Sequence, residues 1–155
     1  MRSPLRVYPD RAPDEVMRQY QEFVFEHRIN PWRIYNADPP SIEFLETFIP
    51  RGMNAVNLIH IREGECTEEK QAEIEAKLSP VVDFLREKGW TDRACIYAFD
   101  ETRSWENLKA WADWVQEKYP DIDFGTTSRD ATYGVETGID NVDFWTPLTP
   151  HYHRE

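Results

Sequence analysis

The sequence predicts an α/β protein whose strands and helices alternate around a parallel sheet. Short apolar runs rich in β-branched and aromatic residues are typical of buried strands, and they occur at residues 53–61, 94–99, 122–126 and 142–145. Segments with apolar residues at helical spacing lie between the first three runs. Strands separated by helices form βαβ units, which pair in parallel through right-handed crossovers. At 155 residues the chain is expected to fold as one domain, residues 1–155.

The first part of the chain predicts two helices and one further extended segment. A helix is expected to begin after Pro13, and its apolar face carries Val16, Tyr20, Phe23 and Val24. Residues 28–35 follow as a short extended segment that Pro31 interrupts, and they are the fifth strand candidate. A second helix is expected to begin near Ser41 and to end near Gly52.

The second part predicts two longer helices. The helix at 67–88 has Ile74, Leu78, Val81, Val82 and Leu85 on one side. Pro80 is expected to start, kink or split this helix, and Gly89 is expected to end it. The last helix covers residues 104–119, and Trp111 lies in its apolar face, which predicts a core position.

Five strands would complete an open, doubly wound sheet at this length, whereas a closed (β/α)₈ barrel typically needs about 250 residues. Both architectures place their functional sites at the carboxyl ends of the strands. The sequence contains neither the dinucleotide-binding glycine motif nor a P-loop, so no nucleotide cofactor is expected.

The charge balance is strongly acidic, with 29 Asp and Glu against 18 Lys and Arg and a net charge of -11. Such a surface repels phosphate backbones and anionic lipids, so neither nucleic acid nor a membrane is expected as a partner. Cys66 and Cys95 lack the spacing of a zinc site. His60 is isolated, and His151 and His153 lie in the terminal segment, so no metal site is expected either.

Polar and aromatic side chains follow the ends of the predicted strands. They are Asn30, His60, Arg62, Asp100, Glu101, Thr127, Ser128, Arg129 and Trp145. The set holds a carboxylate pair, hydrogen-bonding groups and an aromatic side chain, but Ser128 lacks the sequence context of a catalytic nucleophile. His60 is equally compatible with a polar strand residue that finds a hydrogen-bond partner.

Asp100 and Glu101 are adjacent carboxylates at the end of the apolar run 94–99. Charges where a buried strand ends lie close to a low-dielectric interior, and each raises the cost of ionising the other. Such pairs can hold one acid and one anion at neutral pH. The alternative is that the two carboxylates cap the helix that follows, together with Thr102 and Ser104.

Carboxylates beside aromatic and hydroxyl-binding groups suit glycoside chemistry, in which one carboxyl protonates the glycosidic oxygen. Ordinary two-carboxylate glycosidases separate these groups by about 5 Å or more. Sequence neighbours instead fit substrate-assisted hydrolysis, in which the nucleophile is the sugar's own 2-acetamido oxygen. Because neighbours on a strand face opposite sides, both can serve one ligand only if the strand bends or bulges there.

Several motifs of the chain form a pattern with a family resemblance. The stretch 89–101, GWTDRACIYAFDE, resembles the GW…YxFDE signature of the DUF4091 domain and of glycoside hydrolase family 123. Supporting matches lie at 27–31, 52–54, 119–122, 126–127 and at 142–147, VDFWTP. The resemblance covers nearly the whole chain, from about residue 27 to residue 147.

This resemblance implies a (β/α)₈ catalytic domain that acts on β-linked N-acetylgalactosaminides by the substrate-assisted route. It implies that Asp100 orients the 2-acetamido group and that Glu101 is the acid/base. From their positions at or near strand ends, the residues expected to line the sugar subsite are Tyr97, Trp145, His60 and Asn30.

The chain is shorter than the complete barrel of that family, so we expect an α/β fold that resembles the central part of a (β/α)₈ barrel. Such a partial barrel has two open sheet edges, which favour pairing with a second copy. The alternative function is a non-catalytic α/β module that binds carbohydrate or self-associates through those edges. Neither function calls for a cofactor.

Overall fold

The structure is a computed structural model and describes residues 13–148. The chain divides after Arg33 into two compact units, and each unit is described by itself. The first unit contains helix α1 (Asp14–Glu26), which follows Pro13 and carries two acidic residues in its first turn. Proline and acidic residues favour a helix start at this place, so the predicted start is confirmed.

Residues 28–35 do not form the predicted strand. Arg28 has a left-handed φ of 61°, and the side-chain oxygen of Asn30 accepts a hydrogen bond from the Trp32 N–H at 2.9 Å. Pro31 has no N–H to donate to a strand ladder. Because asparagine and proline favour turns in this way, the described part of the chain has four strands and not five.

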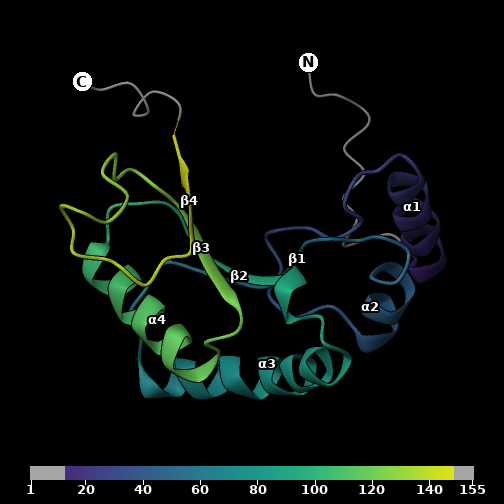
Figure 1. Cartoon of the computed structure of the whole chain (residues 1–155), viewed down its shortest axis with the longest axis horizontal. Helices are drawn as coiled ribbons and strands as arrows, with labels where there is room; N and C mark the ends of the chain where they lie inside the picture. The colour runs from purple at the N-terminus through teal and green to yellow at the C-terminus, as the bar shows by residue number, and fades with distance from the viewer. Residues whose placement is uncertain (1–12, 149–155) are drawn as a thin grey trace. The chain divides into compact units, whose positions relative to one another are not determined.

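The second unit is an α/β fold built on a four-stranded parallel sheet (Figure 1). Its elements in order are α2 (Ile42–Phe48), β1 (Val56–Ile61), α3 (Glu68–Lys88), the short 3₁₀ helix η2 (Thr91–Arg93), β2 (Ala94–Thr102), α4 (Trp105–Lys118), β3 (Asp123–Ser128) and β4 (Phe144–Pro147). The strand order is β1-β2-β3-β4, and each strand pairs in parallel with the next. The predicted α/β class with a parallel sheet is therefore confirmed.

Helix α3 begins and ends where the sequence predicts. The Thr67 side chain accepts a hydrogen bond from the Lys70 N–H as an N-cap, and Gly89 takes the left-handed conformation, φ 67°, that ends the helix. Pro80 lies inside α3, which continues through it to Lys88. The proline therefore neither starts nor splits the helix.

Helices α3 and α4 lie on the same face of the sheet (Figure 1). Their buried side chains are Leu78, Val81, Val82, Leu85, Leu108, Trp111, Ala112, Trp114 and Val115. Trp111 is 1% exposed and donates its Nε1–H to the Gly64 carbonyl at 3.1 Å, so its predicted core position is confirmed. The alternate β2 residues Ile96 and Ala98 are fully buried, as the helix-covered face of a sheet requires. None of the described helices is both long and apolar enough to cross a membrane.

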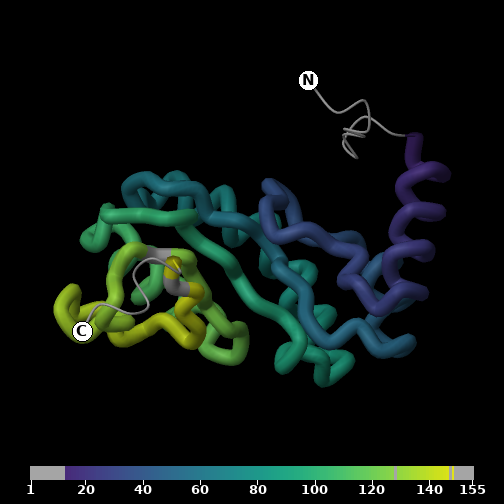
Figure 2. Tube along the Cα trace, turned by 90° about the horizontal axis from the view of Figure 1, so that it is seen from above, coloured from purple at the N-terminus to yellow at the C-terminus, as the bar shows by residue number. Residues whose placement is uncertain are grey.

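Strands β3 and β4 are joined by an irregular segment, residues 129–143, and not by a helix (Figure 2). Asp130 is buried within this segment and organises it. Its carboxylate accepts hydrogen bonds of 2.6 to 2.9 Å from the N–H and hydroxyl of Thr132, the N–H of Gly134 and the hydroxyl of Thr137. Burial by itself raises the pKa of Asp130, but these hydrogen bonds outweigh it and hold the pKa below its ordinary value.

Asp130→Asn is expected to destabilise the fold by about 2 kcal/mol at pH 7. The asparagine side chain lacks the negative charge, and its NH₂ group would face hydrogen-bond donors where the carboxylate offers an acceptor. A carboxyl whose folded-state pKa is depressed stabilises the fold above its unfolded pKa of about 3.9, and this contribution is lost as the pH falls through the folded value. The free energy of unfolding, measured with urea, is therefore expected to differ most between wild type and variant at pH 7, and this difference is expected to shrink below about pH 4. An equal difference at pH 7 and pH 3 would contradict this account.

Candidate functional site

Strand β2 runs past its predicted end at residue 99 and contains both adjacent carboxylates. The partners across β2 and β3 are Ala98 with Thr126, Asp100 with Thr127, and Thr102 with Ser128. Phe99 and Glu101 are therefore extra residues on β2, and both have a left-handed φ, 45° and 54°. Two consecutive bulges thus bend the strand at the carboxylate pair, as a shared ligand would require.

The bulge at Phe99 decides which way Asp100 faces. Asp100 pairs with Thr127, and Tyr97 pairs with Gly125, two residues earlier on β3. Residues two apart on a strand face the same side, and paired residues share a side. In a regular strand Tyr97 and Asp100, three residues apart, would face opposite sides. The extra residue therefore brings Asp100 onto the face of Tyr97.

The strained backbone at Phe99 is held from two sides. Its side chain is fully buried, and its carbonyl accepts a hydrogen bond from the Thr126 hydroxyl at 2.9 Å. A non-glycine residue in this conformation costs about 1–3 kcal/mol and persists only where the surroundings enforce it. Backbone strain of this kind concentrates at functional sites, which makes the end of β2 the candidate site.

Asp100 accepts hydrogen bonds from two phenols. The Tyr35 hydroxyl donates to Oδ2 at 2.9 Å, and the Tyr97 hydroxyl donates to Oδ1 at 3.0 Å. The Tyr97 oxygen also lies 2.6 Å from Oγ1 of Thr127. Because a phenol carries one proton, Thr127 supplies the proton of this second bond when Tyr97 donates to the carboxylate. Both oxygens of Asp100 are thus held in place.

The rings of Tyr35, His60 and Tyr97 pack against one another. His60 stacks on Tyr97 with ring centroids 5.5 Å apart, and Tyr35 lies edge-on to His60 at 5.0 Å and to Tyr97 at 6.0 Å. Strand β1 bulges between Asn57 and His60, and His60 then pairs with Tyr97. The structure therefore brings together three of the residues that the sequence predicts for the site, His60, Tyr97 and Asp100.

These contacts shift the titration of the three rings. The pKa of Tyr35 is raised, first by its hydrogen bond to Asp100 and then by burial and the charge of that carboxylate. Burial raises the pKa of Tyr97 strongly, and its hydrogen bond to Asp100 adds to this. Burial and the nearby charge of Arg62 lower the pKa of His60, so its ring is neutral at pH 7. Within residues 13–148, the buried Nε2 of His60 has no hydrogen-bond partner.

Glu101 is exposed and makes one loose ion pair. Its Oε2 lies 3.5 Å from Nη2 of Arg129, and its backbone carbonyl accepts a hydrogen bond from the Arg129 Nε–H at 3.2 Å. An exposed ion pair of this kind contributes little free energy, so the carboxyl is available to other partners. The charge of Glu101 also helps to raise the pKa of Tyr35, so both carboxylates act on the same phenol.

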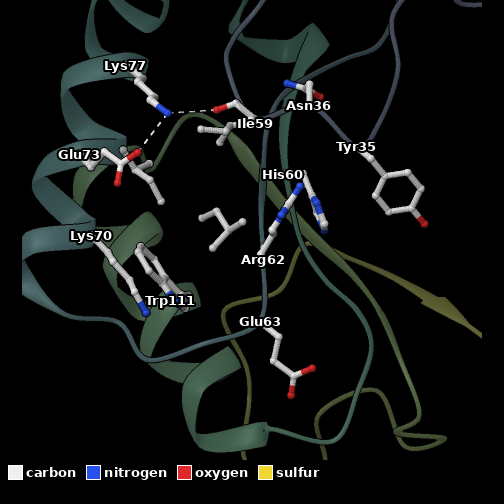
Figure 3. A pocket seen from close by; sticks show the side chains of 13 residues that line it. Tyr35, Asn36, Ile59, His60, Arg62, Glu63, Lys70, Glu73, Lys77 and Trp111 are labelled. Carbon is white, nitrogen blue, oxygen red and sulfur yellow. Dashed lines mark hydrogen bonds and ion pairs between the residues drawn. The ribbon is translucent and has the colours of Figure 1, made fainter. Parts of the chain in front are cut away.

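A pocket of about 440 Å³ opens at the carboxyl end of β1 (Figure 3). Its lining includes Tyr35, His60 and Arg62, and also Lys70 and Glu73 of α3. This volume is within the range of small-molecule sites. Tyr35 both lines the pocket and binds Asp100, but neither Asp100 nor Glu101 is among the residues that line the pocket.

The structure does not bring Trp145, which is predicted for the sugar subsite, to this cluster. Trp145 pairs with Thr126, so it faces the side of the sheet opposite to Tyr97. Its ring instead lies beside Gly134, where an added Cβ would be 3.1 Å from Cζ2. Asn30 belongs to the first unit, and its part in the site stays a prediction.

The alternative role of the carboxylate pair as a helix cap is not what the structure shows. Asp100 and Glu101 lie within β2, and the N-cap of α4 is Ser104. The Ser104 N–H is bound by Oγ1 of Thr102 at 2.9 Å. Over the described part of the chain, no three His, Cys, Asp or Glu side chains form a group that could hold a metal ion.

Sequence patterns do not point to Tyr35, because it lies in a segment without regular structure whose course depends on contacts with distant strands. Asn57 carries a usable signal, since it is a polar residue inside the apolar run 56–61. A buried amide must find partners, and such a residue therefore marks a place where the strand ladder is interrupted.

No protein-family model matches this chain, and no curated protein matches it significantly. The resemblance to the DUF4091 domain and to glycoside hydrolase family 123 therefore rests on the motifs quoted above. Structurally, the second unit is an α/β fold with a four-stranded parallel sheet and a cluster of Tyr35, His60, Tyr97 and Asp100 at the carboxyl ends of its strands.

Proposed function

We propose that the second unit carries a site of the glycoside hydrolase type, directed at β-linked N-acetylhexosaminides and in particular N-acetylgalactosaminides. The observation that supports this best is the pair of bulges at Phe99 and Glu101, which frees two adjacent carboxylates from the alternation of a regular strand. Asp100 would orient and polarise the 2-acetamido group of the sugar. Glu101 would protonate the glycosidic oxygen and then activate a water molecule.

The surroundings of the two carboxylates support these different roles. Asp100 has each oxygen bound by one hydroxyl donor, which fixes the plane of the carboxylate and leaves further lone pairs for an amide N–H. Glu101 is exposed and loosely paired, which suits a group that gives up and regains a proton in each turnover. The rings of Tyr35 and His60 add flat apolar surface beside a pocket, as a sugar ring requires.

We also propose that the four strands form part of a (β/α)₈ barrel. The strands follow one another in chain order without reversal, and α3 and α4 lie on one face (Figure 1). A doubly wound sheet reverses its strand order and carries helices on both faces. In a barrel, the face of Tyr97 and Asp100 would be the interior, and the carboxylate pair would lie at the active-site end.

The test compares a chromogenic β-N-acetylgalactosaminide with the matched β-galactoside, which lacks the 2-acetamido group. Substrate assistance predicts that the first is hydrolysed faster by on the order of 100-fold or more, because only it carries the internal nucleophile. Equal rates for the two substrates would refute the mechanism. A folded protein that hydrolyses neither would refute the enzymatic function.

The sheet edges support the alternative, a non-catalytic module. Within the described residues β4 pairs only with β3, so its outer edge is open. The β1 edge is partly covered, since the Asn36 carbonyl accepts the His60 N–H at 2.8 Å. An open edge favours pairing with a second copy. This alternative predicts that carbohydrate binds without turnover, or that the protein self-associates through β4.

A further inference from the structure

Asn57 lies where β1 bulges, and its side chain takes the place of a ladder hydrogen bond. Its Oδ1 accepts the Tyr97 N–H at 2.8 Å. Its Nδ2 donates to the Ile34 carbonyl, and to Oδ1 of Asn36 at 3.0 Å. These partners fix the orientation of the amide, because the Tyr97 N–H must face the side-chain oxygen and the Ile34 carbonyl must face the side-chain NH₂. One buried side chain therefore joins β2 to the segment that carries Tyr35.

Asn36 completes the same network on the other side of Tyr35. Its Nδ2 donates to the carbonyls of Leu58 at 2.8 Å and Asp38 at 2.9 Å. The backbone carbonyl of Asn36 accepts a hydrogen bond from the His60 N–H. A change of partner by such buried amides costs free energy, because every broken hydrogen bond leaves a buried polar group unsatisfied. The backbone before and after Tyr35 is thus tied to β1.

We propose that Asn57 is a positioning residue that sets both phenols on the carboxylate of Asp100. Asn57 positions Tyr97 by accepting a hydrogen bond from its backbone N–H. Asn57 positions Tyr35 by binding Ile34 and Asn36, the residues immediately before and after it. The two hydroxyls then bind Oδ1 and Oδ2. This inference rests on the proposed role of Asp100 toward the sugar, and it identifies what holds that carboxylate in its orientation.

The test uses two uncharged variants. Asn57→Leu has nearly the same shape and removes the bonds to both tyrosine-bearing segments. Asn36→Ala keeps the Tyr97 N–H and the Ile34 carbonyl bonded to Asn57, and it removes only the side-chain bonds that hold the residue after Tyr35. The matched control is Asn107→Leu, which removes a side-chain hydrogen bond of α4, from the Asn107 amide to the Ser104 hydroxyl.

The readout is the phenol of Tyr35, followed by ¹³C NMR of ring-labelled tyrosine and assigned with Tyr35→Phe. Its pKa is raised chiefly by the hydrogen bond to Asp100, so release of the segment is expected to return the pKa toward about 10. Tyr119 is an internal reference, because burial and not this network raises its pKa. In the same variants, kcat/KM for the chromogenic β-N-acetylgalactosaminide is expected to fall about tenfold to a hundredfold.

An unchanged Tyr35 pKa in a folded Asn57→Leu protein would overturn the proposal, as would an equal change in Asn107→Leu. Thermal melting shows whether Asn57→Leu is folded, and if it is not, Asn36→Ala decides by the same criterion. The phenol titration needs no sugar. If the wild type hydrolyses neither substrate, the proposed function fails while the positioning role of Asn57 is still decided.

Discussion

Glu101→Gln is expected to lower kcat for a β-N-acetylgalactosaminide by about 10² to 10⁴-fold, because glutamine cannot deliver a proton to the leaving oxygen. KM is expected to change little, since the amide has the same shape and since, in the proposed mechanism, Asp100 and the aromatic rings orient the sugar. The variant is expected to fold normally, because the contact it weakens is an exposed ion pair to Arg129 at 3.5 Å. Initial rates over a range of substrate concentrations separate kcat from KM.

The matched control is Glu106→Gln, which removes an exposed carboxylate from the first turn of α4. Its kcat is expected to stay close to that of the wild type. The loss in Glu101→Gln is also expected to be smaller with a nitrophenyl leaving group than with a methyl glycoside, since a good leaving group needs less protonation. Equal rates for Glu101→Gln and the wild type on both substrates would remove Glu101 from the mechanism.

Gly125→Ala is expected to destabilise the second unit by about 3 kcal/mol, because a Cβ at this position would overlap the ring of Phe144. Gly125 pairs with Tyr97 on one side and with Phe144 on the other, so the Phe144 ring covers a gap on the face of the candidate site. Chemical unfolding measures the free-energy change.

A double variant tests the cause of this loss. Phe144→Leu in the Gly125→Ala background removes the ring that the new methyl group meets, and it is expected to recover part of the stability. Gly138→Ala is the control, because it has a left-handed φ of 66° and open space around it. Its cost is expected to be about 1 kcal/mol, from the backbone alone. Additive effects at Gly125 and Phe144 would contradict the steric account.

The local parts of the fold are readable from the sequence because their causes are local. Thr67 and Gly89 cap α3 at the predicted ends through hydrogen bonds and a backbone conformation within a few residues. The strand expected at 28–35 is wrong for a local reason as well. Asn30 and Pro31 form a turn whose side-chain bond competes with strand pairing.

The candidate site also has features that the local sequence determines and features that it does not. The adjacency of Asp100 and Glu101, and their place near the end of an apolar strand, are properties of the chain itself. Whether the two carboxylates and Trp145 share a face depends on strand register and on bulges. A single extra residue reverses the side on which every later side chain lies.

The alternating strands and helices and the adjacent carboxylates follow from the order of residues, because each depends on short-range patterns of apolar and polar side chains. The tertiary structure alone brings Tyr35 and Tyr97 to opposite oxygens of Asp100 and turns Trp145 to the other face. These contacts depend on pairing between segments up to 65 positions apart, where the bulges and the amide of Asn57 set the register. No local pattern encodes that register, because it results from which buried polar groups can all be satisfied at once.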